Sequence, residues 1–328
     1  MPMPPRPIFS TIRYLPNVLP TIGAAKDSTV EWAMRHPLRP LVFRIAAVLS
    51  LALLATAQAA QAKTFAWKAT GKGGTIYLMG SIHVMSESFY PLNPALEAAF
   101  KDSDLLVEEV DMAEMLDPMA QVSMLTRGML PSNQSLDKLL TPSTLALVKK
   151  ATGDLGDAGG PLMRFKPWML AIALQGMELM KAGFDPSLGL DQHFYEEAKA
   201  GSMTVQGLET VDYQISRFDD MTMAQQDRLL AQTLKELETE TAAVGKLGES
   251  WKAGDVAAIE RIALADLKSD PMMYQRLLVE RNRNWVPKIE ALFARRGRAL
   301  VVVGAAHLVG PDGLIAMLRA KGYTIEQL

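Results

Sequence analysis

Short apolar runs alternate with longer amphipathic stretches through residues 63–328 of this chain. Residues 75–79 and 299–303 are rich in aliphatic and β-branched side chains, and their length and composition predict strands. Residues 104–107 predict a buried strand, and residues 203–206 predict a shorter one. Because strands alternate with helical patterns along the chain, the order of elements favours an α/β protein.

Helical patterns fill the sequence between these strands. The pair Asn93-Pro94 is typical of an N-cap followed by proline at the first helical position, and it predicts a helix over residues 94–101. Most of residues 112–296 has helical periodicity and predicts a large helical insertion. Pro287 is expected to kink or split the helix predicted over residues 271–296, because proline removes a backbone hydrogen bond.

A weak internal repeat links the two ends of this region. Strand, Gly-x-x-His, loop, helix and strand follow one another in residues 75–110, and the same order returns in residues 299–328. Both segments are candidate βαβ units, which favour neighbouring parallel strands. Residues 65–70 are expected to pair with the 75–79 strand across a glycine-rich turn. The predicted α/β fold is a central mixed sheet with two βαβ-like units that carry Gly-x-x-His motifs, plus the large helical insertion.

The first 62 residues have a different pattern. A basic segment precedes the uncharged, mostly apolar run of residues 45–57, and small residues at alternate positions follow it. This order is typical of a secretory signal peptide, and the apolar run is short for a membrane span. Met34 is a candidate for the true start of translation. We therefore expect a leader over residues 1–62 and a single periplasmic or secreted domain over 63–328. An uncleaved N-terminal anchor is the alternative.

Composition narrows the class of protein further. The chain has no cysteine, which excludes disulfides, cysteine-based zinc sites and anchoring through a lipidated cysteine. Its formal net charge is −2, and no basic patch indicates a nucleic-acid partner. The 20 methionines predict flexible apolar packing rather than a Cu(I) site. No His-Glu-x-x-His, Gly-x-Ser-x-Gly or P-loop signature is present.

Polar residues follow four of the predicted strands. Two strands end in Gly-x-x-His, at His83 and His307, and the other two end at Glu108-Glu109 and at Glu209. If the strands are parallel, these side chains meet at one edge of the sheet, where open α/β sheets bind ligands. Two imidazoles with carboxylates suit either a divalent metal ion or a metal-free acid–base pair. Alternation along the strand places Glu108 and Glu109 on opposite faces, so one of them is open to solvation.

Arg281 and His193 are two further polar residues for which the sequence allows more than one role. Arg281 lies in a charged helical stretch, where it is either part of a solvated face or a fixed guanidinium. A fixed guanidinium would bind a carboxylate of the site or of a substrate terminus through two hydrogen bonds. His193 follows Leu190-Asp191-Gln192 at the start of a predicted helix, where we expect it to cap the helix or to pack.

The motifs taken together resemble those of the TraB/GumN family, which is also called the TraB/PrgY/Tiki group. The resemblance covers roughly residues 64 to 328, with the motifs in the expected order. It is carried by Gly80-Ser-Ile-His83, Phe89-Tyr-Pro-Leu92, Val107-Glu-Glu-Val-Asp111, Gly189-Leu-Asp-Gln-His-Phe194, Gly207-Leu-Glu-Thr210, Arg281-Asn282 and Val303-Gly-Ala-Ala-His-Leu-Val-Gly-Pro-Asp-Gly313.

Membership of this family would imply an activity, a fold and a set of site residues. Tiki members of the group are described as metal-dependent proteases that act on secreted or extracellular peptides. The resemblance implies an α/β fold with paired Gly-x-x-His motifs and an active-site carboxylate. The matching positions here are His83, Glu109, Glu209 and His307, with Arg281 as a helper.

The sequence therefore predicts an exported hydrolase, with a divalent-metal-dependent peptidase as the preferred form. His83, His307 and Glu109 or Glu209 would bind Mn²⁺, Co²⁺ or Zn²⁺, and the other glutamate would act as general base. The substrate would be a peptide or a small molecule, with no nucleic acid and no membrane span after signal cleavage. Two alternatives stay open, namely a metal-free His/Glu hydrolase of the esterase type and a non-catalytic periplasmic binding protein.

Overall fold

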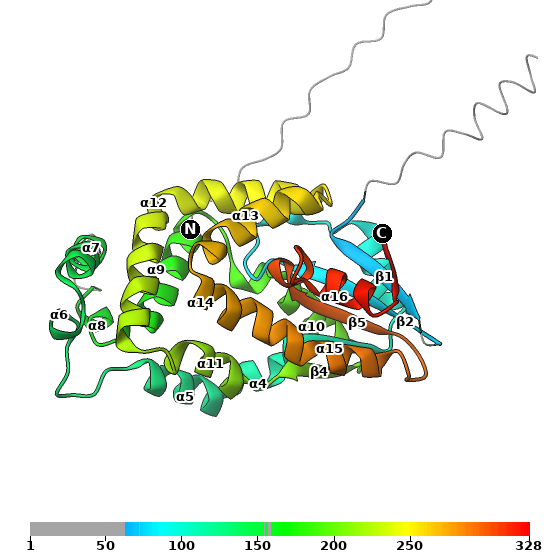
Figure 1. Cartoon of the computed structure of the whole chain (residues 1–328), viewed down its shortest axis with the longest axis horizontal. Helices are drawn as coiled ribbons and strands as arrows, with labels where there is room; N and C mark the ends of the chain where they lie inside the picture. The colour runs from blue at the N-terminus through cyan, green and yellow to red at the C-terminus, as the bar shows by residue number, and fades with distance from the viewer. Residues whose placement is uncertain (1–62, 72, 154, 157–158) are drawn as a thin grey trace, which may run out of the picture. The chain divides into compact units, whose positions relative to one another are not determined.

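The computed structural model describes residues 63–71, 73–153, 155–156 and 159–328. The predicted signal peptide and the candidate start at Met34 lie outside these residues. The described part of the chain is one α/β unit, which Figure 1 shows as a sheet beside a large helical region.

The sheet has six strands in the order β4-β3-β5-β2-β1-β6. Strands β2, β5, β3 and β4 run parallel to one another, whereas β1 pairs antiparallel with both β2 and β6. The predicted mixed sheet is therefore confirmed, and so is the hairpin of β1 with β2. The strand bounds are β1 Ala66–Gly71, β2 Gly74–Ser81, β3 Leu105–Val110, β4 Thr204–Glu209, β5 Ala299–Gly304 and β6 Thr324–Gln327.

Strand order differs from the simple βαβ expectation. The two strands of each predicted unit are not neighbours, because β5 lies between β2 and β3, and β6 pairs only with β1. Instead, the two Gly-x-x-His strands pair with each other, with Ser81 opposite Gly304. Every residue of β5 up to Val303 is buried, and such a strand is most stable at the centre of a sheet covered on both faces.

Helices make up most of the remaining chain, as predicted. Asn93 caps the helix predicted after it, with its side-chain oxygen 2.9 Å from the backbone nitrogen of Ala95. The α-helices are α3 Pro94–Lys101, α4 Met112–Met115, α5 Pro118–Gly128, α6 Leu136–Leu139, α7 Pro142–Gly153, α8 Gly159–Leu162, α9 Pro167–Lys181, α10 Leu190–Ala200, α11 Val211–Asp219, α12 Met223–Lys252, α13 Val256–Ser269, α14 Pro271–Tyr274, α15 Glu280–Leu292 and α16 Leu314–Ala320. Shorter turns are η1 Glu87–Phe89, η3 Pro186–Leu188, the π-helical η4 Gln275–Val279 and η5 Ala305–Leu308.

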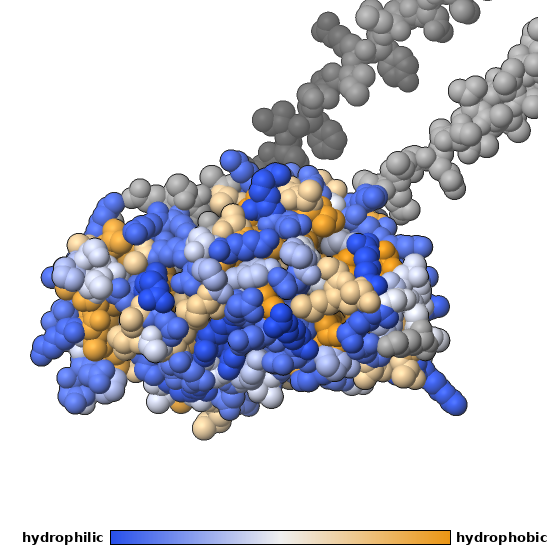
Figure 2. Space-filling model, in the orientation of Figure 1, coloured by the Kyte–Doolittle hydropathy of each residue, from blue (hydrophilic) through white to orange (hydrophobic). Residues whose placement is uncertain are grey.

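Three apolar clusters of buried residues hold the described elements together, and the smallest contains Trp168, Met169 and Ile215. The largest cluster surrounds the sheet, where strands rich in Val, Leu and Ala pack against α3, α10, α15 and α16. A second cluster lies in the helical region, where α12, a helix of 30 residues, packs against α9 and α7. Figure 2 shows that hydrophilic side chains cover most of the face in view and that hydrophobic ones are scattered in small groups, as on an ordinary globular surface.

The helix predicted over residues 271–296 is divided, but not at Pro287. The interruption is the π-helical turn η4, between α14 and α15, and α15 continues through Pro287 to Leu292. Pro287 and Arg283 are both exposed, so water can bind the carbonyl that loses its backbone partner. π-Helical turns often mark functional sites, and this one comes directly before the turn of α15 that carries Arg281.

Candidate functional site

The four parallel strands bring their carboxyl ends to one edge of the sheet. His83 follows β2, Glu109 lies near the end of β3, Glu209 ends β4, and His307 lies in η5 directly after β5. Arg281 reaches the same edge from α15. The structure thus brings together all five residues that the sequence singled out, although they come from five different elements.

Arg281 is the centre of this group. Its Nη2 atom donates to Oε2 of Glu109 at 2.5 Å and to Oε1 of Glu209 at 2.7 Å, and its Nε atom donates to Oε1 of Glu209 at 3.0 Å. Its Nη1 atom donates to the carbonyl of Leu277 at 3.3 Å and lies 3.1 Å from Nε2 of His307. Of the two possibilities for a fixed guanidinium, the structure therefore shows the first, in which Arg281 binds carboxylates of the site.

The two glutamates are buried and differ in their surroundings. Burial alone would raise the pKa of Glu109, but Arg281, His307 and His83 together hold that pKa well below its usual range. Glu109 also accepts from the backbone nitrogen of Gly304 at 2.7 Å. Burial raises the pKa of Glu209 despite its hydrogen bonds with Arg281. Glu109 is thus the fixed anion of the site.

Glu209 is enclosed on all sides. Besides its three hydrogen bonds from Arg281, Glu209 accepts at Oε2 from the indole nitrogen of Trp285 at 2.8 Å. The side chain is almost completely buried, with an exposed fraction of 3%. These contacts make Glu209 an anchor for Arg281 rather than a group that faces a substrate.

His307 is held in one tautomer. Its Nδ1 atom lies 2.7 Å from Oδ1 of Asn282, and Nδ2 of the same amide donates to the carbonyls of His307 and Asp312 at 3.1 and 2.8 Å. Because the amide oxygen can only accept, Nδ1 of His307 carries the hydrogen and Nε2 accepts from Arg281. Burial lowers the pKa of His307 to about 3, so this imidazole is neutral at physiological pH.

His83 has the opposite character. Its side chain is 62% exposed, and its Nδ1 atom lies 2.8 Å from Oδ2 of Asp191. The Asp191 carboxylate, opposed by desolvation, raises the pKa of His83 to about 9. The imidazole is therefore protonated at neutral pH and paired with Asp191. The side chain is exposed, so it can meet a ligand from solvent.

Gly304 separates His83 from Glu109. A Cβ atom at this position would lie 3.1 Å from Oε1 of Glu109, 3.4 Å from Nε2 of His83 and 3.6 Å from Cδ2 of His307. The three side chains therefore surround the small space that glycine leaves open. A molecule that approaches the Gly304 backbone from solvent would meet the free nitrogen of His83 and the carboxylate of Glu109 together.

Asp191 was not predicted as a residue of the site, although it lies in the Gly189–Phe194 motif that carries part of the family resemblance. Asp191 lies in the first turn of α10, where a carboxylate is favoured by the helix dipole. Gly189, before it, permits a close approach, since a Cβ there would lie 2.3 Å from the carbonyl oxygen of His83. A glycine two residues before an aspartate was the feature of the sequence that could have indicated Asp191. Asn282, next to Arg281 in the sequence, was likewise not predicted to have a role in the site.

Glu108 occupies the other face of β3 and is not solvated. Glu108 and Glu109 are both buried, with exposed fractions of 1% and 7%. Burial, and then the charge of Asp191, raises the pKa of Glu108 to about 8. Its Oε2 atom accepts from the backbone nitrogen of Met112 at 3.3 Å, while Oε1 has no hydrogen-bond partner among the described residues. Glu108 is therefore a buried, neutral acid at pH 7.

The predicted ligands differ from a preformed metal site in arrangement, though not in type. Nε2 of His307 accepts from Arg281, and the Glu109 oxygens accept from Gly304, Arg281 and Gln214. The donor atoms of His83, Glu109 and His307 do not all lie within 4.8 Å of one another. An ion at His83, Glu109 and His307 would therefore require Arg281 to move away from Nε2 of His307.

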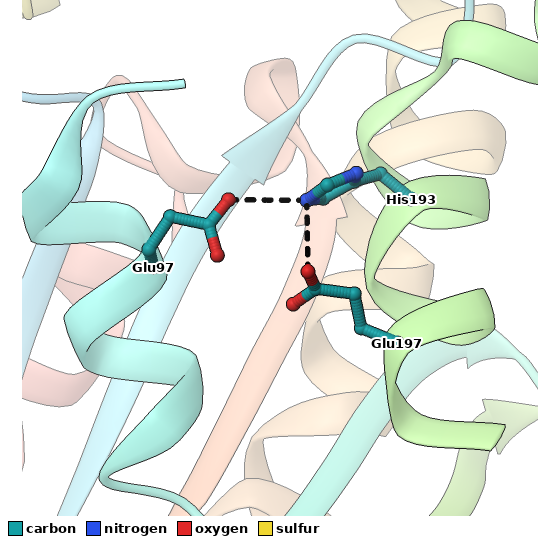
Figure 3. A group of neighbouring side chains, drawn as sticks. All are labelled: Glu97, His193 and Glu197. Atoms are coloured by element: carbon teal, nitrogen blue, oxygen red, sulfur yellow. Dashed lines mark hydrogen bonds and ion pairs between the residues drawn. The ribbon is translucent and has the colours of Figure 1, made fainter. Parts of the chain in front are cut away.

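One group of metal-ligand type is present among the described residues, in a different place. Glu97, His193 and Glu197 offer three ligand atoms within 4.8 Å of one another, as Figure 3 shows. His193 was expected to cap or pack. It does pack against aromatic rings, and it also contacts these two carboxylates.

The fold and the site define an α/β protein with a buried centre of histidine, glutamate and arginine at the carboxyl edge of a mixed sheet. The chain belongs to the TraB/PrgY/gumN family, whose model matches residues 65–327. The family resemblance of the sequence motifs is thereby confirmed.

The relatives leave the activity open. The chain is 28% identical over 246 residues to the uncharacterized protein YbaP of Escherichia coli (strain K12), covering 74% of this chain and 87% of that protein. It is 23% identical over 269 residues to an uncharacterized protein of Treponema pallidum (strain Nichols), covering 78% of this chain and 80% of that protein. No solved structure matches the chain. Within the described residues, no helix combines the length and the apolar character needed to cross a membrane.

Proposed function

We propose that this protein is a hydrolase of ester or amide bonds in which His83 and Asp191 form the proton-transfer pair. One observation carries the proposal: Nδ1 of His83 is fixed on the Asp191 carboxylate at 2.8 Å while the side chain remains 62% exposed. A base oriented by a third group, with its other nitrogen open, is the arrangement that general acid–base and nucleophilic catalysis share.

The chemistry of the pair follows from its charges. The reaction needs the neutral imidazole, which predominates only above about pH 9. In that form, Nε2 of His83 takes a proton from water as the water oxygen bonds to the carbonyl carbon of the substrate. The same nitrogen then gives the proton to the leaving oxygen or nitrogen as that bond breaks. Asp191 accepts from Nδ1 in both states and stabilises the imidazolium between them.

Glu109 and Arg281 assist the His83–Asp191 pair, the first through its charge and the second by positioning Glu109. Glu109 is ionised and near His83, so it favours the imidazolium that forms during proton transfer. Arg281 has its donors occupied by the two glutamates, Leu277 and His307, which makes it a positioning residue for Glu109. Neutral His307 completes the wall of the site without adding charge next to Arg281.

A cleft lies beside Glu209 at the end of β4, and His83, Asp191 and Glu109 are not among its lining residues. The cleft, of about 720 Å³, is lined by Glu209, Tyr213, Asn284, Trp285 and Lys288, together with residues of β4. This volume is within the range of sites for small molecules and short peptide segments. Asp111, Glu114 and Glu209 line this cleft with Lys288 as its one cation. Together with the aromatic surface of Trp285 and Tyr213, they support a partly apolar substrate with a carbonyl or a cationic group rather than an anionic one.

The test uses activated esters and a mixed peptide pool. We expect His83→Ala to lower kcat/KM by about 10²–10⁴-fold, since that is the usual worth of a general acid–base group. Asp191→Asn should lower turnover and move its pH dependence to lower pH, because the charge that raises the pKa of His83 is lost. Glu196→Gln, an exposed change on the same helix, is the matched control. Unchanged turnover in His83→Ala would refute the proposal.

The divalent-metal peptidase is the second candidate, and one observation favours it. Both imidazoles have Nδ1 bound to a fixed acceptor, Asp191 for His83 and Asn282 for His307, as metal-binding histidines usually do. His83, His307 and Glu109 would hold Mn²⁺, Co²⁺ or Zn²⁺, which would supply a Lewis acid. The guanidinium of Arg281 would first have to leave His307. Turnover that is lost in a chelator and restored by one of these ions would select this candidate over the metal-free one.

We also propose that the protein is exported to the periplasm or beyond the cell after loss of residues 1–62. The basic segment, the apolar run of residues 45–57 and the small residues after it support this. N-terminal sequencing of the protein recovered from outside the cytoplasm should begin near Lys63. An intact leader on that material would instead favour the N-terminal anchor.

A further inference from the structure

A second cluster of metal-binding side chains lies away from the site described above, between helices α3 and α10. Figure 3 shows Glu97 of α3 and both His193 and Glu197 of α10 pointing toward one another. Nε2 of His193 lies 3.2 Å from Oε1 of Glu97 and 3.9 Å from Oε1 of Glu197. Two carboxylates therefore share one nitrogen of one imidazole.

The sequence builds this cluster through helical spacing. His193 and Glu197 are four residues apart, which places them one turn apart on the same face of α10. Glu97 lies in the first turn of α3, the helix that begins at the Asn93 cap. The cluster therefore depends on two rigid helices rather than on a loop.

Charge is not balanced within the cluster. Across the described residues, neither Glu97 nor Glu197 forms an ion pair with a lysine or an arginine, and the imidazole of His193 contacts both carboxylates. Even when His193 is protonated, two carboxylates leave one negative charge, and when it is neutral they leave two. A half-buried pair of carboxylates without further compensation attracts a cation.

The imidazole is held in place and the cluster is open to solvent. The ring of His193 packs against Tyr90 and Phe194, with centroids 5.5 and 4.9 Å away. His193 and Glu197 also line a surface depression of about 560 Å³, with Tyr90 and Leu188 on its wall. The site thus has both a fixed nitrogen donor and an entry path, as a metal site requires.

We propose that Glu97, His193 and Glu197 bind one divalent transition-metal ion, with Zn²⁺ as the best match. One imidazole with two carboxylates is a donor set that zinc accepts, at bond lengths of about 2.0–2.2 Å. The ligand atoms already lie within 4.8 Å of one another, so small side-chain movements suffice. The fourth position is left for water.

The ion would join α3 to α10 and so stabilise the end of the helix that carries Asp191. Asp191 is two residues before His193 in α10 and contacts His83. The proposal does not depend on the hydrolase reaction, because none of its three ligands contacts the residues of the main site through an ion pair or hydrogen bond described above.

Equilibrium dialysis of the full chain against Zn²⁺, with metal analysis and thermal unfolding, tests the site. The His83→Ala/His307→Ala double variant keeps the main site from contributing. We expect this variant to bind one Zn²⁺ and its Tm to rise by at least about 2 °C with saturating ion. Adding His193→Ala should abolish the binding and the shift, and Glu97→Gln or Glu197→Gln should weaken affinity by about tenfold or more.

Glu249→Gln is the control, because the side chain of Glu249 is 78% exposed on α12, outside the cluster and its surface depression, and should leave binding unchanged. Cooperative unfolding of each variant without metal shows that it is folded, and the conservative glutamine variants remain informative if His193→Ala is not. Equal Zn²⁺ binding with and without His193 would overturn the proposal. So would loss of Zn²⁺ in the His83→Ala/His307→Ala variant, since that result would place the ion in the main site.

Discussion

At the residue scale, the two histidines of the site have opposite electrical roles although they come from matching motifs. His83 is exposed and paired with Asp191, which raises its pKa to about 9, whereas burial lowers the pKa of His307 to about 3. The sequence context is the same Gly-x-x-His in both cases. The difference arises from the side chains that other elements bring near each ring.

NMR of the imidazole groups measures this difference directly. Because the chain has only four histidines, their signals are readily assigned. We expect His83 to titrate near pH 9 and His307 to stay neutral from pH 5 to 8. Asp191→Asn should return the midpoint of His83 toward about 6.5, the value of a free imidazole. A midpoint for His83 that does not move in this variant would contradict the assigned pairing.

The sign of the stability effect differs for the two rings. The folded pKa of His83 lies above the unfolded value, so its ion pair stabilises fully below about pH 6.5 and is lost as pH rises through about 9. The folded pKa of His307 lies below the unfolded value, so stability is lost as pH falls from about 6.5 toward 3. Solvent weakens the first effect, because the His83 side chain is 62% exposed.

Glu108 provides a separate pH prediction. Its folded pKa of about 8 lies above 4.5, the usual value of a glutamate, so the folded chain binds more protons between these values and stability falls as pH rises through this window. Glu108→Gln resembles the neutral acid and carries no charge to bury. We expect the free energy of unfolding of Glu108→Gln to rise relative to that of wild type by on the order of 2 kcal/mol when the pH is raised from 5 to 9. Urea unfolding at both pH values measures this, with Glu196→Gln as the exposed control.

At the element scale, one arginine connects a helix with two strands. Arg281 of α15 bonds to Glu109 of β3 and Glu209 of β4, so the guanidinium fixes α15 against the carboxyl edge of the sheet. The π-helical turn η4 joins α14 directly to α15, with helical backbone dihedrals at both junctions. The Arg281 connection positions Glu109 as well as stabilising the fold.

Replacement of Arg281 should be costly for this reason. Arg281→Ala leaves two buried carboxylates without their partner, and breaking such an arrangement usually costs about 3–5 kcal/mol. Arg281→Lys keeps a charge but loses the fork of donors, so it should fall between the alanine variant and wild type. Urea denaturation with Arg283→Ala, an exposed change on the same helix, as control gives the comparison. A loss below about 1 kcal/mol in Arg281→Ala would show that the contacts do not bear on stability.

At the scale of the whole molecule, the described residues form one compact unit. Its three apolar clusters, its sheet and both Gly-x-x-His motifs all lie within residues 63–328. The pairing of β6 with β1 brings the end of the chain beside its first strand, where the backbone nitrogen of Thr64 donates to the carbonyl of Leu328 at 2.7 Å.

A chain that begins at Lys63 should therefore fold by itself. We expect its thermal unfolding to be cooperative, with a midpoint within about 2 °C of that of the full chain under the same conditions. Differential scanning calorimetry of both chains makes the comparison. Non-cooperative melting of the shorter chain would mean that residues before Lys63 contribute to the core.

The sequence by itself determined the strands and the residues at their ends. Apolar β-rich runs such as residues 299–303 must be buried, and polar residues directly after them must then lie at a sheet edge, so His83, Glu109, Glu209 and His307 could be placed without coordinates. Local signals such as the Asn93 cap were equally readable, because they involve neighbours in the chain.

Only the tertiary structure decided which side chains meet. Arg281 and Glu109 are 172 positions apart and His83 and Asp191 are 108 apart, and no local pattern connects such pairs. The insertion of β5 between β2 and β3, and the meeting of α3 with α10 at His193, have the same origin. Strand order and helix contacts follow from how all buried surfaces pack at once, and a single stretch of sequence does not contain that information.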